Sequence, residues 1–524
     1  MILSFAFITL LSFLSIGNSI NISNDFYGES NSTISPSYYA SSQWAIGKIE
    51  LDKAWDISTG SSDVLVGVID SGIRGTHEDL LSNLSTIKAY TSGNGYSTSL
   101  EDLHGHGTHV AGIIGADGSN SAGVAGVCWN ISISSLRGGH IEGDNNVMSN
   151  TELYSLITFA TNSNILFINL SYGGFSLNGT VASAILNYPG LFICSAGNQN
   201  YNLNDVSHYP ASYNYENMIV VGNSTSLDEK ASTSNYGTEV VDIFAPGTSI
   251  WSTMKNNDSD YACWSGTSMA APYVTGVAAL LKSINPTLTP AQIKAAILDN
   301  ADHITALNTY CPYGRRLNAY KAALAVLPTF TTDQTINSIQ AIPVGGHQWY
   351  KINASACTRH FTNLYSIDLT ASLYSDVQGT PLITGSSNGG YLFNYTFPSS
   401  GTYYLKVTNN SSFSSSYSIA MSNSHVHVYE NSYEWRNSTQ HYAYCECGSS
   451  TIQAHIVQSG TNTCMLCHGT ASGGFIGPLS IGQSILTDSY LYPNGNVSLG
   501  QIDYNNYING LLTVDEIYEG ALYA

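Results

Sequence analysis

The sequence predicts an α/β protein in which a doubly wound parallel sheet fills the N-terminal half and β-rich modules follow it. Near-continuous apolar runs are typical of strands buried on both faces of a parallel sheet. Five such runs span residues 64–69, 165–170, 191–196, 218–221 and 240–244. Helical patterns separate these runs. From residue 329 the pattern changes to short alternating strands with Gly, Pro, Asn and Ser turns.

Composition and charge restrict the class of partner. At about 100–200 residues per domain, the 524 residues indicate several domains. The chain has 16 Lys and Arg against 36 Asp and Glu, a net charge of -20. Such a surface repels phosphate backbones, so we expect no nucleic-acid partner. Plentiful Tyr (36) and Gly (48), with only 10% charged residues, suit β-rich extracellular modules.

The N-terminus predicts secretion. Residues 2–16 form an uncharged apolar run, followed by Gly17-Asn18-Ser19 with small residues at the first and third positions. This pattern is typical of a secretory signal peptide, assigned to residues 1–19. Residues 20–42 are a short polar segment. No later stretch is long enough to span a bilayer, so we expect a secreted, extracellular or cell-surface protein without a transmembrane segment after the signal.

The parallel sheet is predicted to belong to a domain over residues 43–327. Near the end, Thr289-Pro290-Ala291-Gln292 combines an N-cap, a first-turn proline and a capping-box glutamine. A last helix over 318–326 ends before Pro328, which places the domain boundary there.

A serine turn in this domain carries the clearest chemical signal. The segment Gly266-Thr-Ser268-Met-Ala-Ala-Pro272 runs into a helical apolar pattern. Ser268 is therefore predicted at a helix N-terminus, where unpaired N–H groups favour negative charge. Pro272 is expected in the first turn, where its missing N–H costs nothing. An isolated serine here would be an ordinary N-cap. The other motifs of the chain therefore decide whether Ser268 has a structural or a catalytic role.

Three further motifs end apolar runs or open a small-residue helix. They contain Asp70 in Ile-Asp-Ser-Gly, His106 in His-Gly-Thr-His-Val-Ala-Gly, and Asn198 in Ser-Ala-Gly-Asn. With the Ser268 turn, and in the order Asp, His, Asn, Ser, they resemble the subtilisin-like serine proteases, the subtilases of peptidase family S8. The resemblance implies a subtilisin-like fold and a secreted serine endopeptidase that works through an acyl-enzyme and needs no cofactor for catalysis.

The resemblance also implies the role of each residue. Ser268 would be the nucleophile, His106 the general base and then acid, and Asp70 the carboxylate that orients the imidazole. Asn198 would donate its amide to the oxyanion together with the Ser268 N–H. Of the other nearby histidines, His109 is expected to pack inside and His104 to lie in a loop.

Substrates are expected to be proteins or peptides bound through their backbone. By the resemblance, Ser171, Tyr172 and Gly173 line both an exposed strand edge and the pocket for the residue before the scissile bond. Ala196 and Gly197 would form the far wall of that pocket. His208 would stand at its base, where it shortens the pocket or gives it pH-dependent polarity.

A structural calcium ion is one interpretation of a nearby loop. Asp79 and Asn120 match positions that hold calcium in many relatives, and oxygen ligands suit this ion. The loop over 117–120 is one residue longer than the usual pattern. A solvated polar loop is the alternative.

Residues 329–423 are predicted to form a β-sandwich, with half-buried strand patterns at 348–352 and 401–408 near its opposite ends. This segment resembles the bacterial pre-peptidase C-terminal domain. By that analogy it would attach the protein or handle substrate, for example through a cell-surface or matrix ligand.

A Cys/His-rich module is predicted over residues 424–470, followed by a tail over 471–524. Its Cys-x-Cys and Cys-x-x-Cys pairs would close a structural zinc site or form two disulfides; the cysteines are Cys445, Cys447, Cys464 and Cys467.

A different function class is a catalytically silent or self-maturing surface protein that binds through its C-terminal modules. A silent scaffold predicts damage at one of the four motif positions. Asp70, His106, Asn198 and Ser268 are all intact, which favours the enzyme.

Overall fold

The computed structural model describes two compact units, residues 1–328 and 329–524. Within them it describes 43–87, 102–142, 145–330, 335–338, 341–354, 358–365, 368–386, 391–425, 433–435, 440–444 and 450–454. The predicted signal peptide, the segment over 20–42, the tail and the four cysteines of the Cys/His module lie outside these residues.

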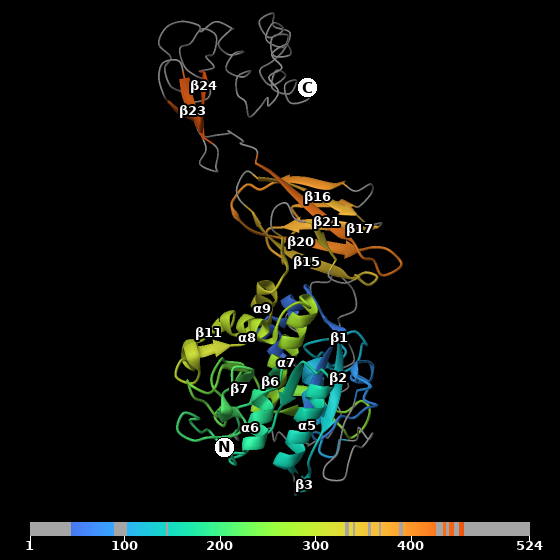
Figure 1. The fold of residues 1–524 in the computed structure, drawn as a ribbon, viewed down its shortest axis with the longest axis vertical. Helices are drawn as coiled ribbons and strands as arrows, with labels where there is room; N and C mark the ends of the chain where they lie inside the picture. Colours follow the sequence, from blue (N-terminus) through green and yellow to red (C-terminus); the bar gives the residue numbers. More distant parts are fainter. Residues whose placement is uncertain are drawn as a thin grey trace, which may run out of the picture. The chain divides into compact units, whose positions relative to one another are not determined.

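Unit 1 is built on an eight-stranded sheet of order β11-β12-β8-β7-β6-β5-β1-β2 (Figure 1). Neighbouring strands from β12 to β2 pair in parallel, and β11 pairs antiparallel with β12. The prediction of a mostly parallel sheet is therefore confirmed. The strands are Gly60–Asp70 (β1), Asn130–Arg137 (β2), Phe167–Leu170 (β5), Leu191–Ser195 (β6), Met218–Ser224 (β7), Ile243–Pro246 (β8), Asp302–His303 (β11) and Arg315–Arg316 (β12).

Helices cover the sheet (Figure 1). The long helix α7 contacts β1, β5, β6, β7 and β8, and also packs on α4. Helices α5 and α6 share a separate apolar cluster with the sheet, which includes Ile69, Leu156, Ile185 and Phe192. The helices are Trp44–Lys48 (α2), Leu51–Trp55 (α3), His106–Gly115 (α4), Asn150–Asn162 (α5), Gly179–Leu186 (α6), Thr267–Ile284 (α7), Pro290–Asp299 (α8) and Ala319–Ala325 (α9).

Local signals in the sequence account for several helix starts. Thr289 forms the expected capping box with Gln292 ahead of α8. Asn318 caps α9 by accepting from the Lys321 N–H at 2.9 Å. Two small antiparallel pairs complete the unit: β3 (His140–Glu142) with β4 (Asn145–Val147), and β9 (Ile250–Thr253) with β10 (Tyr261–Trp264).

The expected position of Pro272 is wrong. Helix α7 begins at Thr267, so Pro272 is its sixth residue and lies inside the helix. A proline there cannot donate to the carbonyl oxygen four residues earlier. That oxygen belongs to Ser268, and it must find its hydrogen bond elsewhere.

Unit 2 holds two sheets that share one apolar cluster. One has the order β13-β15-β20-β17-β18 and the other β14-β21-β16-β19. The two strand patterns singled out in the sequence, β15 and β20, are antiparallel neighbours. Tyr350 and Ile419, from different sheets, both belong to the cluster. The strands are Thr329–Phe330 (β13), Thr335–Asn337 (β14), His347–Ala354 (β15), Thr358–Tyr365 (β16), Leu369–Tyr374 (β17), Ile383–Ser386 (β18), Tyr391–Thr396 (β19), Gly401–Asn409 (β20) and Ser418–His425 (β21).

A third, smaller sheet follows in the same unit. Its strands run antiparallel in the order β22 (Tyr433–Trp435), β23 (Gln440–Tyr444) and β24 (Ser450–Ala454).

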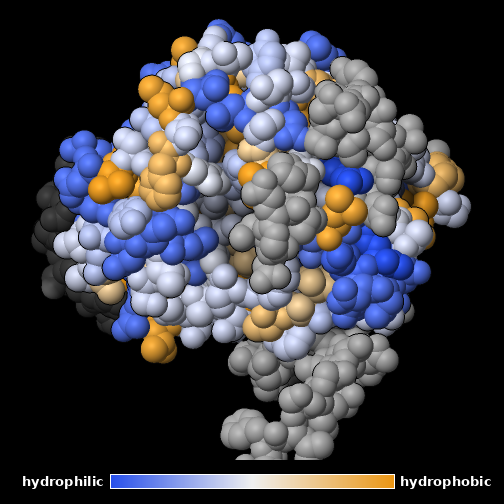
Figure 2. Space-filling model, turned by 90° about the horizontal axis from the view of Figure 1, so that it is seen from below, coloured by the Kyte–Doolittle hydropathy of each residue, from blue (hydrophilic) through white to orange (hydrophobic). Residues whose placement is uncertain are grey.

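The molecular surface in Figure 2 is seen from below in the orientation of Figure 1, the end where β3 lies. Hydrophobic residues stand among hydrophilic and neutral ones on this face. Across the described residues, no helix has the length and apolar character needed to cross a membrane.

Candidate active site

An Asp–His pair forms where β1 ends and α4 begins. Asp70 is the last residue of β1 and His106 the first of α4. The His106 Nδ1 lies 2.9 Å from both carboxylate oxygens of Asp70. The Ser71 N–H also donates to Asp70 Oδ1 at 2.7 Å. Gly107 lets the first turn of α4 lie close to the chain that follows β1, because a Cβ there would stand 2.1 Å from the Gly72 carbonyl oxygen.

A second buried carboxylate, Asp102, holds the start of α4. It accepts from Ser71 Oγ, the N–H groups of His104, Gly105 and Thr108, and Thr108 Oγ1, at 2.5–2.9 Å. These donors include N–H groups that the beginning of a helix leaves unpaired. Asp102 thereby fixes the turn that presents His106 to Asp70.

The environment of His106 favours its charged form. Burial acts to lower the pKa of His106, but the charge and hydrogen bond of Asp70 outweigh it, so the pKa lies above its ordinary value of 6.5. An imidazole that is readily protonated yet neutral at higher pH suits a general base.

Trp264 packs beside this imidazole. Its ring centroid is 6.0 Å from that of His106 and 5.1 Å from that of His109, on which it stacks at 11°. His109 is fully buried and bonds the Ala262 carbonyl oxygen through Nε2 at 3.1 Å. Burial lowers the pKa of His109 to about 3, so it stays neutral and structural. The expected inward packing of His109 is confirmed.

Ser268 is the second residue of α7, as the sequence predicts. Helix α7 packs on α4, the helix that begins with His106, and Trp264, four residues before Ser268, contacts the His106 ring. The Ser268 hydroxyl is directed to the Ser171 carbonyl oxygen at 3.4 Å rather than to the imidazole. Catalytic hydrogen bonds are often loose in the absence of substrate.

Asn198 is oriented by the residue before the serine. The Thr267 N–H and hydroxyl both donate to Asn198 Oδ1, at 2.9 and 3.1 Å. The amide nitrogen is therefore directed away from Thr267. A Cβ placed on Gly266 would lie 3.5 Å from Asn198 Nδ2 and 3.7 Å from the Ser268 nitrogen. Both predicted oxyanion donors thus border the same small space.

The segment after β5 offers an open backbone edge. Gly174 is paired with Tyr209 through two backbone hydrogen bonds of 2.7 and 2.8 Å. Tyr172 and Gly173, by contrast, make no backbone hydrogen bond to another described residue. Their N–H and C=O groups can therefore pair with an extended peptide.

The facing wall contains Ala196 and Gly197. Asn235 Nδ2 donates to the Ala196 carbonyl oxygen at 2.8 Å, and the Asn235 N–H donates to that of Gly197 at 2.9 Å. The Gly197 N–H donates to Thr267 Oγ1 at 3.1 Å. The wall is thereby tied to the start of α7.

His208 lies between these two walls. A Cβ on Gly173 would stand 2.3 Å from His208 Cε1, and one on Gly197 would stand 2.9 Å from the same atom. Both walls can lie this close to the ring edge because each has a glycine, which carries no Cβ, at this point.

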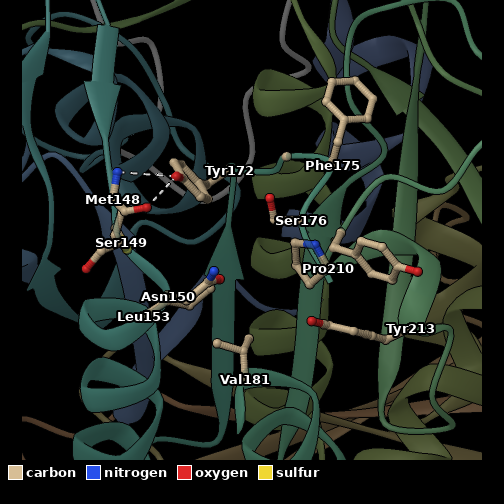
Figure 3. Close-up of a pocket in the computed structure, with 12 residues that line it drawn as sticks. Met148, Ser149, Asn150, Leu153, Tyr172, Phe175, Ser176, Val181, Pro210 and Tyr213 are labelled. Atoms are coloured by element: carbon tan, nitrogen blue, oxygen red, sulfur yellow. Dashed lines mark hydrogen bonds between the residues drawn. The ribbon is translucent and has the colours of Figure 1, made fainter. Parts of the chain in front are cut away.

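A pocket of about 320 Å³ with a mixed polar and apolar lining opens beside the segment after β5 (Figure 3). Figure 3 shows Tyr172 bonded to the backbone of Met148, whose carbonyl oxygen accepts from the phenol at 2.6 Å. The remaining lining residues are Ser149, Asn150, Leu153, Gly174, Phe175, Ser176, Val181, Tyr209, Pro210 and Tyr213.

The predicted calcium residues contact each other through nitrogen donors. Asn120 Nδ2 donates to Asp79 Oδ1 at 2.9 Å, and the Val124 N–H donates to Asp79 Oδ2 at 2.8 Å. Asn120 Oδ1 accepts from the Ala122 N–H. Burial raises the pKa of Asp79 to about 7. In this arrangement each carboxylate oxygen of Asp79 accepts from a nitrogen donor, and calcium stays a prediction from the sequence.

The described cysteines form no disulfide. Cys128, Cys194 and Cys311 are buried and Cys263 is exposed, and burial raises the pKa of each buried thiol. Cys194 lies in β6 and belongs to the apolar cluster shared by α5, α6 and the sheet. The described part of the chain contains no cluster of three or more His, Cys, Asp or Glu side chains suited to a metal.

The sequence motifs do not identify several residues that hold the site together. Thr267 and Asn235 act through contacts distant in sequence, which no short motif records. Asp102 alone had a local signal, because an aspartate just before a helix can accept from its first N–H groups.

An Asp–His pair and a serine at a helix start, delivered by a parallel α/β sheet in the chain order Asp, His, Ser, define the subtilisin-like class of serine endopeptidases. A family model described as the subtilase family matches residues 61–334. This chain belongs to that family.

Individual relatives agree with this assignment. The chain is 39% identical over 294 residues to the Thermophilic serine proteinase of Bacillus sp. (strain AK1), covering 55% of this chain and 69% of that protein. It is 37% identical over 288 residues to Thermitase of Thermoactinomyces vulgaris, covering 54% and 97%. It is 34% identical over 284 residues to Subtilisin DY of Bacillus licheniformis, covering 53% and 97%.

Proposed function

We propose that this chain is a secreted endopeptidase that hydrolyses peptide bonds with Ser268 as nucleophile, His106 as general base and acid, and Asp70 as the orienting carboxylate. The observation that carries the proposal is the 2.9 Å contact of Asp70 with His106 Nδ1. With Nδ1 engaged, Nε2 is the nitrogen left to exchange a proton with the serine.

The reaction follows in two transfers. Ser268 Oγ attacks the carbonyl carbon of the scissile peptide while its proton moves to His106 Nε2. The oxyanion lies between the Ser268 N–H and Asn198 Nδ2, which favour the negative charge that develops. The imidazolium then protonates the leaving amine as the C–N bond breaks. Water then attacks the acyl carbon while His106 takes its proton; the ester C–O bond breaks, the imidazolium returns the proton to Ser268 Oγ, and the acid product leaves.

Substrate would bind as an extended strand along the open edge of Tyr172 and Gly173. The side chain before the scissile bond would enter between this edge and the Ala196–Gly197 wall. An apolar side chain further upstream would suit the pocket bordered by Leu153, Val181 and Tyr213, since burying apolar area favours binding.

The other predictions complete the proposal. Residues 1–19 would direct secretion and be removed, and Asp79 with Asn120 would hold a structural calcium ion. The sheets of residues 329–423, which resemble the pre-peptidase C-terminal domain, would attach the enzyme to a surface or matrix ligand. The cysteines Cys445, Cys447, Cys464 and Cys467 would bind zinc or form two disulfides.

A fluorophosphonate probe tests the function directly, because it reacts only with an activated serine. We expect the purified full-length protein to be labelled and to cleave casein, and Ser268→Ala to do neither. Intact mass would show whether residues 1–19 are removed. A folded wild-type protein that is neither labelled nor proteolytic would contradict the proposal and favour a silent binding scaffold.

A further inference from the structure

His208 closes the far end of the slot between the two substrate-binding walls. The edge of its imidazole that carries Cε1 and Nδ1 would stand 2.3 and 2.9 Å from a Cβ on Gly173. The same Cε1 would stand 2.9 Å from a Cβ on Gly197. A substrate side chain that reaches the level of Gly173 and Gly197 in the slot therefore meets this ring edge.

The His208 imidazole is buried, and one of its two nitrogens is enclosed without a hydrogen-bond partner. His208 is 3% exposed, and its Nδ1 has no partner among the described residues. Its position is fixed in other ways: the backbone N–H donates to Ser212 Oγ at 2.9 Å, and the Phe175 ring packs edge-on at 5.3 Å. Leaving a buried polar nitrogen unpaired costs stability, so a ligand that pairs with it gains that energy on binding.

Among the described residues, no charged side chain acts on the His208 ring. Gly173 and Gly197 present backbone, Phe175 presents a phenyl ring, and beyond it stands the phenol of Tyr201 at 6.0 Å from Phe175. Burial is the sole cause that lowers the pKa of His208, with no contribution from a described carboxylate or cation. A negative group entering the slot would therefore meet no carboxylate of the described chain there.

We propose that His208 makes this enzyme selective for substrates with glutamate or aspartate immediately before the scissile bond. This inference rests on the proposed peptidase function. A carboxylate supplies both an acceptor and a compensating charge, and charge-assisted hydrogen bonds are about twice as strong as neutral ones. An aliphatic side chain would leave the nitrogen unpaired, and a large aromatic one would collide with the ring.

The test uses peptide p-nitroanilides that differ only in the last residue, which is Glu, Gln, Ala or Phe. We expect kcat/KM for Glu to exceed that for Gln by about tenfold or more, and both to exceed Phe. The Glu to Gln ratio should rise as the pH falls from about 8 to about 6, because His208 takes up a proton to pair with the carboxylate. Taking the ratio at each pH cancels the titration of His106.

Two variants separate charge from shape. His208→Gln keeps a polar side chain without a titrating proton, so the pH dependence of the Glu to Gln ratio should disappear. His208→Gly opens the slot, so kcat/KM should rise for the Phe substrate and fall for the Glu substrate. A preference for Ala that does not change with pH would overturn the proposal and leave His208 as a steric plug.

Fluorophosphonate labelling distinguishes the two levels of failure. A wild-type protein that is labelled, but whose kcat/KM for the Phe or Gln substrate equals that for the Glu substrate, would overturn only the role of His208. A folded wild-type protein that does not label would overturn the peptidase function and, with it, the inference.

Discussion

Ser171 Oγ donates a 2.9 Å hydrogen bond to the backbone carbonyl oxygen of Ser268. Pro272 is the reason that this oxygen is available, because a proline inside α7 has no N–H to donate back to it. Ser171 is itself held by Asn169, which accepts from Thr275 on α7 at 2.9 Å. The substrate-binding segment and the helix start that carries the nucleophile are therefore joined by a buried polar network.

Removing this hydroxyl should impair turnover. In Ser171→Ala the Ser268 carbonyl loses its partner in a buried setting, and we expect kcat to fall on the order of 5- to 10-fold with a smaller change in KM. The matched control is the double variant Ser171→Ala with Pro272→Ala, in which the new alanine N–H can bond the Ser268 carbonyl. Steady-state kinetics should show partial recovery. Equal activity of the single and double variants would mean that the hydrogen bond to the Ser268 carbonyl oxygen does not affect turnover.

Asp70 should set the acid limb of the pH profile. The neutral imidazole of His106 is the active base, and Asp70 stabilises its protonated form, which raises the pKa of His106 above 6.5. Activity is therefore lost on acidification at a higher pH than for a free imidazole. In Asp70→Asn we expect the acid limb of kcat/KM to move to lower pH.

The same variant should lower kcat by about 10⁴, the loss known for this substitution in a trypsin-type triad. Profiles of kcat/KM over pH for both proteins provide the measurement. An unchanged acid limb would mean that a group other than His106 controls it.

Asp102 should contribute to stability more than to chemistry. Its carboxylate accepts from five donors around the start of α4. An amide at this position would turn one N–H group toward those donors, so Asp102→Asn should cost about 1–3 kcal/mol of unfolding free energy. Thermal unfolding measures this, with the exposed Asp63→Asn as the control expected to change little. An equal Tm for both variants would contradict the role of Asp102.

The sequence predicts a site residue where a few neighbouring residues are enough to recognise its position. Asp70 and His106 each end or begin an apolar element, and such positions can be recognised from a few residues. The buried runs around Val68 and Ile193 likewise identify strands of a parallel sheet, because both faces are covered. The long-range partners could not be predicted, since Thr267 and Asn235 gain their roles only when distant segments meet.

Proline shows how the fold overrides a local rule. A proline near a helix start usually lies in the first turn, but here Thr267 begins the helix and leaves Pro272 inside it. The cost of the missing hydrogen bond is offset by Ser171, which lies 97 positions earlier in the chain. No local pattern records that compensation.

Calcium would be seen as a change in thermal stability. If Asp79 and Asn120 bind the ion after their side chains rearrange, millimolar Ca²⁺ should raise the Tm by several degrees over the same protein in EDTA, because a ligand held only by the folded state stabilises it. Asp79→Asn should remove this difference. The same Tm in Ca²⁺ and EDTA for the wild type would favour the solvated polar loop.

Asn198 should act on the transition state, because its amide borders the space next to the Ser268 nitrogen. Asn198→Ala should lower kcat by about 10² to 10³ with little change in KM, the range known for loss of such a donor in subtilisin itself. Thr267→Val removes one of the two donors that orient Asn198 Oδ1 and leaves the amide in place, so its loss should be smaller.

Stopped-flow and steady-state kinetics on one peptide substrate would separate the two effects. A rise in KM with unchanged kcat in Asn198→Ala would mean that the amide binds substrate and transition state equally. In that case the positive end of α7 and the Ser268 N–H would have to stabilise the oxyanion without it.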